Sequence, residues 1–116
     1  MPLTAPLAVP VEIRVPDRRV TRLSVDVGES GLTLERPVPF EIDHPVEVTF
    51  ALPDNTAATW TAPLALRAVV ALTDADGDGA NGGRALTFLD PPREARQTIV
   101  RYVAHRLQLP GAAPTG

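Results

Sequence analysis

Apolar and polar residues alternate in six short runs, and this pattern constrains the fold of the 116-residue chain more than any other feature. A period of two is typical of a β-strand with one face in a core and the other in water. Six such strands separated by turns indicate a small barrel or sandwich. The runs cover residues 9–15, 22–27, 32–35, 46–52, 60–72 and 86–88.

Prolines divide these runs and mark the ends of the domain. The 13 prolines include Pro63, which interrupts the fifth run, so that we expect this stretch to be an edge strand or to contain a bulge. Prolines also recur near both termini. We therefore expect an N-terminal tail at residues 1–8, one domain at residues 9–108 and a C-terminal tail at residues 109–116.

The spacing of apolar residues changes after Asp90-Pro91-Pro92, which reads as a helix N-cap followed by proline at the first helical position. Helical spacing then extends as far as Leu107, so the sequence predicts six strands and a C-terminal helix that closes or flanks the barrel. The predicted core comprises Val11, Ile13, Val25, Val27, Leu34, Val48, Phe50, Leu66, Ala68, Leu86, Phe88, Ile99 and Val103.

Composition excludes several classes of protein. The chain has no cysteine, which excludes disulfides, zinc–thiolate sites and cysteine nucleophiles. Its net charge of −3 argues against a general nucleic-acid binder. No apolar run approaches the roughly 18 residues of a membrane span, and the first residues lack the basic start of a signal peptide. A cytoplasmic location is therefore expected.

Candidate sites for catalysis or metal binding are weak. The sequence contains no catalytic triad, P-loop or zinc-protease motif, and neither His44 nor His105 has a suitably spaced partner, so we expect no enzymatic activity. Residues 74–79 resemble the start of a calcium loop, but Asn81 and Ala85 stand where such a loop needs an apolar residue and a bidentate carboxylate. We expect a flexible loop at residues 74–83 and no metal site.

Two features are candidates for binding. Arg18, Arg19 and Arg22, with Arg14 nearby, form the densest basic cluster. The cluster either is a solvated hairpin or binds phosphates and guanine edges, which the arginine fork matches. Trp60 is the only tryptophan, and it either anchors a partner at an edge strand or plugs one end of the barrel.

Residues 24–34 carry a motif that resembles the PilZ domain, the bacterial receptor module for cyclic di-GMP. Asp26, Gly28 and Gly31 have the spacing of the family motif Asp/Asn-x-Ser-x-x-Gly. The resemblance extends over about residues 9–107, including the Pro-rich link after the motif and the closing helix. It implies an all-β, six-stranded antiparallel barrel with one C-terminal α-helix.

The motif is degenerate, which affects the expected ligand. Gly28 replaces the family's serine, and residues 1–8 lack the Arg-x-x-x-Arg that the family carries before its first strand. Arg18 and Arg22 have that spacing but lie between the first two predicted strands. Loss of two arginine contacts and a hydroxyl removes roughly 3.5–7.5 kcal/mol of binding free energy.

These departures predict a PilZ-like signalling or adaptor module that acts through protein partners, with no cofactor and no usual cyclic di-GMP site. Regulation of motility or of type IV pili is what the resemblance implies. Two alternatives remain at this point. One is a cyclic di-GMP receptor that uses Arg14, Arg18, Arg19 and Arg22 in an unusual arrangement. The other is a structural oligomerisation module built through the edge strand at Pro63.

Overall fold

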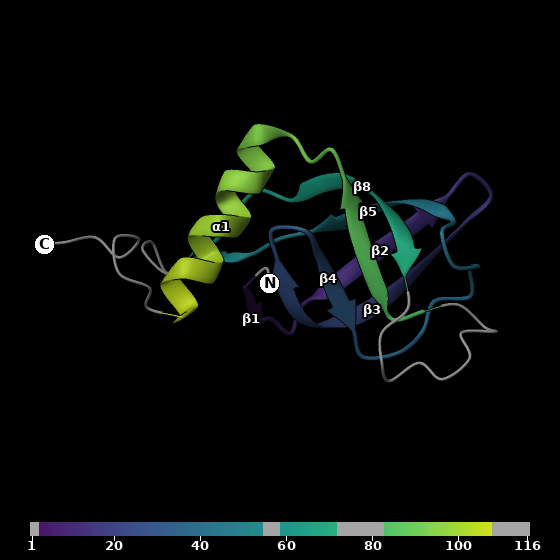
Figure 1. Cartoon of the computed structure of the whole chain (residues 1–116), viewed down its shortest axis with the longest axis horizontal. Coiled ribbons are helices and arrows are strands. Elements are labelled where there is room, and N and C mark those ends of the chain that lie inside the picture. Colours follow the sequence, from purple (N-terminus) through teal and green to yellow (C-terminus); the bar gives the residue numbers. More distant parts are fainter. Residues whose placement is uncertain (1–2, 55–58, 72–82, 108–116) are drawn as a thin grey trace, which may run out of the picture.

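The chain forms an antiparallel sheet that curls into a barrel, with one helix after it (Figure 1). The computed structural model describes residues 3–54, 59–71 and 83–107. The strands and helix in these ranges are β1 (Thr4–Pro6), β2 (Pro10–Val15), β3 (Arg18–Gly28), β4 (Gly31–Leu34), β5 (Pro45–Phe50), β6 (Pro53–Asp54), β7 (Thr59–Trp60), β8 (Leu64–Ala71), β9 (Ala85–Leu89) and α1 (Arg93–Leu107).

The order of strands in the main sheet is β1-β3-β2-β5-β8-β9-β4, and β4 also pairs with β3. This last pairing closes six strands, β2, β3, β4, β5, β8 and β9, into the predicted antiparallel barrel. Every pairing of these strands is antiparallel, as in barrels that close by hydrogen bonding between their first and last strands.

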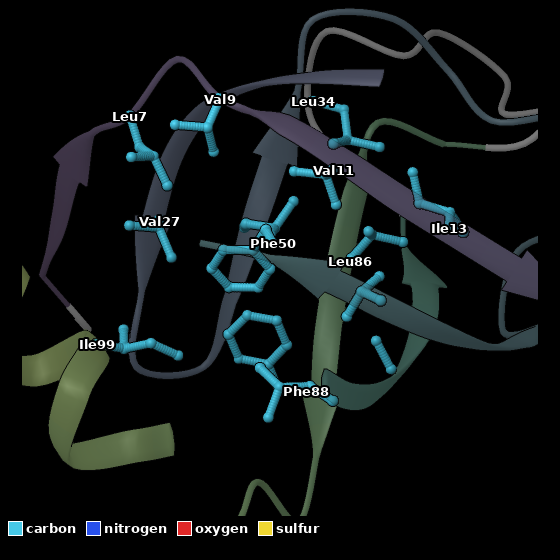
Figure 2. Packing of buried hydrophobic residues seen from close by; sticks show 14 of the residues in the cluster. Leu7, Val9, Val11, Ile13, Val27, Leu34, Phe50, Leu86, Phe88 and Ile99 are labelled. Atoms are coloured by element: carbon cyan, nitrogen blue, oxygen red, sulfur yellow. The ribbon is translucent and has the colours of Figure 1, made fainter. Parts of the chain in front are cut away.

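One apolar cluster fills the barrel, and it contains every predicted core residue except Val25. Phe50 of β5 and Phe88 of β9 stack across the interior with ring centroids 6.3 Å apart (Figure 2). Ile99 of α1 joins the same cluster, so the helix and the barrel share one core.

The prediction that Val25 points into the core is wrong, since its side chain is 47% exposed. The register of β3 against β4 shifts between Ser24 and Asp26, as expected for a β-bulge. The shift changes which residues face inward, so that Ser24 is buried and Val27 returns to the core.

The predicted N-terminal tail is also wrong for residues 3–8. β1 pairs with the end of β3, and Ala5 and Leu7 are buried in the core cluster. Between β1 and β2 the chain bends around the Ser24 side chain. Ser24 Oγ donates a hydrogen bond to the Leu7 carbonyl and accepts one from the Val9 N–H at 3.0 Å.

Pro63 divides the predicted fifth strand in two. Thr59–Trp60 forms β7, which pairs with β6 in a separate two-stranded sheet, whereas Leu64–Ala71 forms β8. β8 lies between β5 and β9 and is therefore central in the barrel, so the prediction of an edge is wrong for β8, whereas β7 pairs along one edge only.

α1 begins at Arg93, three residues after the predicted N-cap. Asp90 has a φ of 43°, a turn conformation that differs from that of an N-cap residue. The Pro92 carbonyl, just before the helix, accepts the first helical hydrogen bond, which comes from the Arg96 N–H.

The helix packs on β1 and β3 at one end of the barrel (Figure 1). Its buried residues are Ala95, Ile99, Tyr102, Val103 and Ala104, whereas Leu107 of the predicted apolar stripe is partly exposed. The Tyr102 hydroxyl donates a hydrogen bond of 2.6 Å to the carbonyl of Pro6, the last residue of β1, and so ties α1 to that strand. Most of the predicted acidic loop, with its calcium assignment, and the predicted C-terminal tail lie outside the described residues.

Candidate functional site

The three motif residues Asp26, Gly28 and Gly31 lie together on the β3–β4 hairpin. Asp26 pairs with Thr33, and Gly28 pairs with Gly31 next to the turn. The same stretch of β3 also pairs with β1, through Thr4 opposite Gly28 and Pro6 opposite Asp26. The motif is therefore flanked by β1 on one edge and by β4 on the other.

Gly28 is buried beneath the backbone of the N-terminal segment. A Cβ atom at this position would lie 2.7 Å from the Leu3 carbonyl oxygen and 3.0 Å from Thr4 Cγ2. The nearer atom belongs to the backbone and cannot rotate away as a flexible side chain can. A serine here would therefore require β1 to move, so the fold of the N-terminal segment and the loss of the motif serine are consistent with each other.

Gly31 is required by packing and not by its backbone conformation, because its φ lies outside the left-handed region. Instead, a Cβ at Gly31 would overlap the Leu86 carbonyl oxygen, because β9 runs close beside β4 at this point. Gly31 therefore permits the β4–β9 pairing that closes the barrel.

The Asp26 side chain does not stabilise the turn of the hairpin. Within the described part of the chain its carboxylate accepts no hydrogen bond. It is half-buried between β1 and β4. Of the motif, only the two glycines have a clear function in packing.

The four arginines of the basic cluster are divided between the two faces of the β2–β3 hairpin. Arg14 and Arg19 are cross-strand partners on the exposed outer face. Arg14 Nη2 lies 2.6 Å from Glu47 Oε2 of the neighbouring strand β5. The hydrogen bond and negative charge of Glu47 raise the pKa of Arg14.

Arg18 and Arg22 contact the Pro-rich segment that follows β4. The Arg18 guanidinium lies over the Phe40 ring, 5.4 Å from its centroid. Arg22 donates hydrogen bonds from Nε to the Pro37 carbonyl at 3.1 Å and from Nη1 to the Thr21 carbonyl at 3.0 Å. The cluster is therefore not one convergent site, because two of its members hold a loop and a third is paired with Glu47.

Trp60 is 58% exposed on β7, opposite Pro53 of β6. The reading in which it plugs one end of the barrel is wrong. That position is free for a contact with another molecule, which is the other reading that the sequence offered.

Other candidate groups do not assemble into a site. His44 Nδ1 lies 2.8 Å from the Pro45 carbonyl, and its ring is 5.9 Å from that of Phe40. No three potential metal ligands gather anywhere in the described ranges. A hollow of about 520 Å³ on the outer face is lined by Arg14, Val15, Pro16, Pro45, Val46, Glu47 and Arg67.

The residues that sequence reasoning missed are Leu3, Thr4 and Ser24. Leu3 and Thr4 cover the motif, and Ser24 holds the bend that brings β1 over it. The sequence does contain a signal for β1, since Ala5, Leu7 and Val9 continue the alternation of the first run toward the N-terminus. The prolines at positions 2, 6 and 10 obscured this pattern.

Comparison with known proteins places this fold and motif in a family. The sequence model of the PilZ domain matches residues 5–105, and the chain therefore belongs to the PilZ domain family. It is a small module of the PilZ signalling and adaptor type. No curated protein matches the chain.

Among solved structures, the Bacillus subtilis Inhibitor of motility (MotI/DgrA) is similar, with a TM-score of 0.74 over 93% of this chain. The sequence identity is 16%, and the likeness therefore shows a shared fold. The chain spans about half the length of that protein, 51% of which is covered. None of the helical segments in the described ranges is long and apolar enough to span a membrane.

Proposed function

We propose that this PilZ domain is a non-catalytic, cytoplasmic adaptor that acts through protein partners and does not bind cyclic di-GMP in the usual manner of its family. One observation carries the proposal: the Leu3 carbonyl covers Gly28, the position of the motif serine. The hairpin that would receive the nucleotide is thus covered by the chain itself.

Two further observations support the loss of the nucleotide site. Residues 1–8 contain no arginine, so the segment that covers the motif brings no guanidinium to it. Arg18 and Arg22 contact the Pro-rich segment, whereas Arg14 pairs with Glu47 on the outer face. This division disfavours a receptor with an unusual arginine arrangement. The central position of β8 likewise disfavours an oligomerisation module built through that strand.

The proposal of a protein partner is supported by the fold and by the exposed aromatic residue. The structurally similar Bacillus subtilis protein is an inhibitor of motility by its title. We propose that this chain also regulates motility or another envelope machine, and that Trp60, which is exposed on β7, contacts the partner. Tryptophan is among the residues that contribute most to protein interfaces.

Calorimetric titration with cyclic di-GMP at physiological salt tests the first part of the proposal. We expect no saturable binding in the low-micromolar range. Any weak attraction to exposed arginines should disappear by about 0.5 M salt and should be the same for Asp26→Ala. Stoichiometric binding that Asp26→Ala abolishes would overturn the proposal.

Affinity capture from lysate of the native cell tests the second part. We expect a specific protein to be retained equally with and without cyclic di-GMP. Trp60→Ala should reduce its retention, whereas Val100→Ala, another exposed apolar position, should not. If no protein is retained by a folded domain, the adaptor function is wrong.

A further inference from the structure

β3 is the longest strand of the barrel, and its first half is paired along only one edge. Residues 18–23 pair with β2, whereas pairing with β4 begins only at Ser24. The last backbone contact on the β4 side joins the Glu35 N–H to the Leu23 carbonyl. Within the described ranges, no strand lies beside residues 18–22 on that side. The Pro-rich segment approaches it through the side chains of Arg18 and Arg22, and an added strand would displace the Arg22 guanidinium from the Thr21 and Pro37 carbonyls.

The backbone groups on this open edge can be identified from the alternation of a strand. The Leu23 carbonyl faces β4, so the backbone groups of Thr21 and Arg19 face the same direction. In the described structure only one of these groups has a partner, the Thr21 carbonyl, which accepts from Arg22 Nη1. The Arg19 N–H and carbonyl and the Thr21 N–H have none there.

The outer face beside this edge is basic at one end and apolar at the other. Arg19, Thr21, Leu23 and Val25 are all exposed, the two apolar side chains by 43% and 47%. Arg19 stands directly opposite Arg14, a like-charge pair that destabilises a sheet. Glu47 neutralises Arg14, but Arg19 has no ion pair in the described part of the chain.

We propose that the open edge of β3 at residues 18–22, which we call the β3 edge, binds an extended segment of a partner protein as an additional strand. The segment would place an acidic side chain beside Arg19 and an apolar side chain beside Thr21, diagonal to Leu23. This proposal rests on the adaptor function and specifies one surface for it.

The charge of the β3 edge identifies the occupant as an acidic segment. Arg18, Arg19 and Arg22 give this five-residue stretch three positive charges. Pairing with a second copy of the chain would bring six such charges together, which disfavours a homodimer through this edge. An acidic strand relieves the repulsion between Arg14 and Arg19 and also supplies partners for the open backbone groups.

A fluorescein-labelled peptide, Glu-Thr-Val-Thr-Glu-Thr-Val-Thr-Glu-Thr, is a suitable probe, because one of its faces alternates glutamate and valine. Thr21→Pro removes the N–H that faces the β3 edge and leaves the pairing with β2 intact. Thr21→Val is the matched control, since it retains the N–H. We expect Thr21→Pro to weaken binding about tenfold, measured by fluorescence anisotropy, and Thr21→Val to weaken it less than twofold.

Charge reversal tests the predicted acidic contact. Arg19→Glu should weaken peptide binding about tenfold, whereas Arg101→Glu, an equal change of net charge on the exposed face of α1, should have little effect. A peptide with lysine in place of each glutamate should not bind. Circular dichroism and thermal unfolding establish that each variant is folded.

Amide hydrogen exchange locates the bound peptide. The Arg19 and Thr21 amides should exchange quickly in the free protein and become protected with the peptide, whereas the Val20 and Arg22 amides should be protected in both states. Peptide binding that leaves Arg19 and Thr21 unprotected, or equal binding by Thr21→Pro and Thr21→Val, would overturn the proposal.

Capture of the cellular partner by variants of the domain tests the β3 edge and the adaptor function separately. If a captured protein is retained equally by wild type, Thr21→Pro and Arg19→Glu but lost with Trp60→Ala, the adaptor function stands and the β3 edge is not its docking surface. If no protein is captured, the adaptor function fails, and the peptide assay still decides whether the edge accepts a strand. If sedimentation shows a dimer of the wild type that Thr21→Pro converts to a monomer, the proposal of an acidic partner is wrong and the occupant of the β3 edge is a second copy of the chain.

Discussion

Ser24 is the residue whose behaviour differs most from its sequence pattern. It lies in an alternating run as one of the polar members, yet its side chain is buried and Val25 is exposed. A one-residue shift of register changes which side chains face the core, and nothing in the alternation itself reveals a bulge. Residue-level prediction therefore succeeded where strands are regular, as in β2 and β5, and failed at this bulge.

Replacement of Ser24 by alanine should destabilise the protein by about 1–3 kcal/mol. The change leaves the Leu7 carbonyl and the Val9 N–H without their common partner at the bend between β1 and β2. Urea unfolding measures the difference. Ser30→Ala is the control, because that residue is exposed in the β3–β4 turn and should change stability little. Equal stability of Ser24→Ala and wild type would contradict this assignment.

Restoring the motif serine should harm the fold and should not restore nucleotide binding. The added Cβ of Gly28→Ser meets the Leu3 carbonyl oxygen, and overpacking of this kind costs about 1–3 kcal/mol. We expect a lower thermal midpoint and faster proteolysis at the N-terminal segment. Ser30→Thr, which adds a methyl group at an exposed position of the same turn, should leave both unchanged. Tight cyclic di-GMP binding by Gly28→Ser would show that β1 is easily displaced.

At the scale of elements, the sequence pattern predicted the six barrel strands and the helix. It did so because the side chains that alternate along each strand are the ones that face the core once the barrel closes. The elements that were missed depend on tertiary contacts. β1 is three residues long and is held by β3 and α1. β7 is two residues long and is separated from β8 by the segment that ends at Pro63. Short segments of this kind have no periodicity long enough to identify them.

The attachment of α1 to β1 should depend on pH in the alkaline range. Burial raises the pKa of Tyr102, against a smaller opposing influence of Arg106. The neutral phenol is favoured in the folded state, so its contribution to stability is complete below the ordinary pKa of about 10 and is lost as pH rises through the higher folded value. Because the chain has one tyrosine, no lysine and no cysteine, no other side chain titrates there.

Tyr102→Phe tests this link between α1 and β1. It removes the hydrogen bond to the Pro6 carbonyl, and we expect a loss of about 0.5–1.5 kcal/mol at neutral pH. Above about pH 10 the stability of wild type should fall more steeply than that of the variant. Chemical denaturation at several pH values measures both slopes. Parallel curves would show that the phenol ionises without disturbing the link.

At the scale of the whole molecule, one core unites the barrel and the helix, and its composition was largely predictable. The candidate site was less so. The sequence located Asp26, Gly28 and Gly31 on one hairpin, but it gave no indication that backbone from the N-terminus covers them. The contact between the Leu3 carbonyl and Gly28 joins residues that are distant in sequence, so a local motif cannot predict it.

Phe50→Ala should destabilise the whole domain by about 3–5 kcal/mol. Phe50 is buried and stacks on Phe88, so that truncation opens a cavity between β5 and β9. Equilibrium unfolding in urea measures the cost. Val100→Ala, which removes apolar atoms from an exposed side of α1, is the matched control and should cost less than about 0.5 kcal/mol. A cost below 1 kcal/mol for Phe50→Ala would contradict the assigned core.

The hydrogen bond between Tyr102 and the Pro6 carbonyl joins residues 96 positions apart. On the ribosome, Pro6 must therefore wait for the synthesis of Tyr102 before this tether can form. Until α1 has emerged, β1 lacks its support from the helix, and the motif hairpin is less securely covered than in the finished domain. The nascent chain, rather than the mature protein, is thus the form in which this hairpin is most accessible to other molecules.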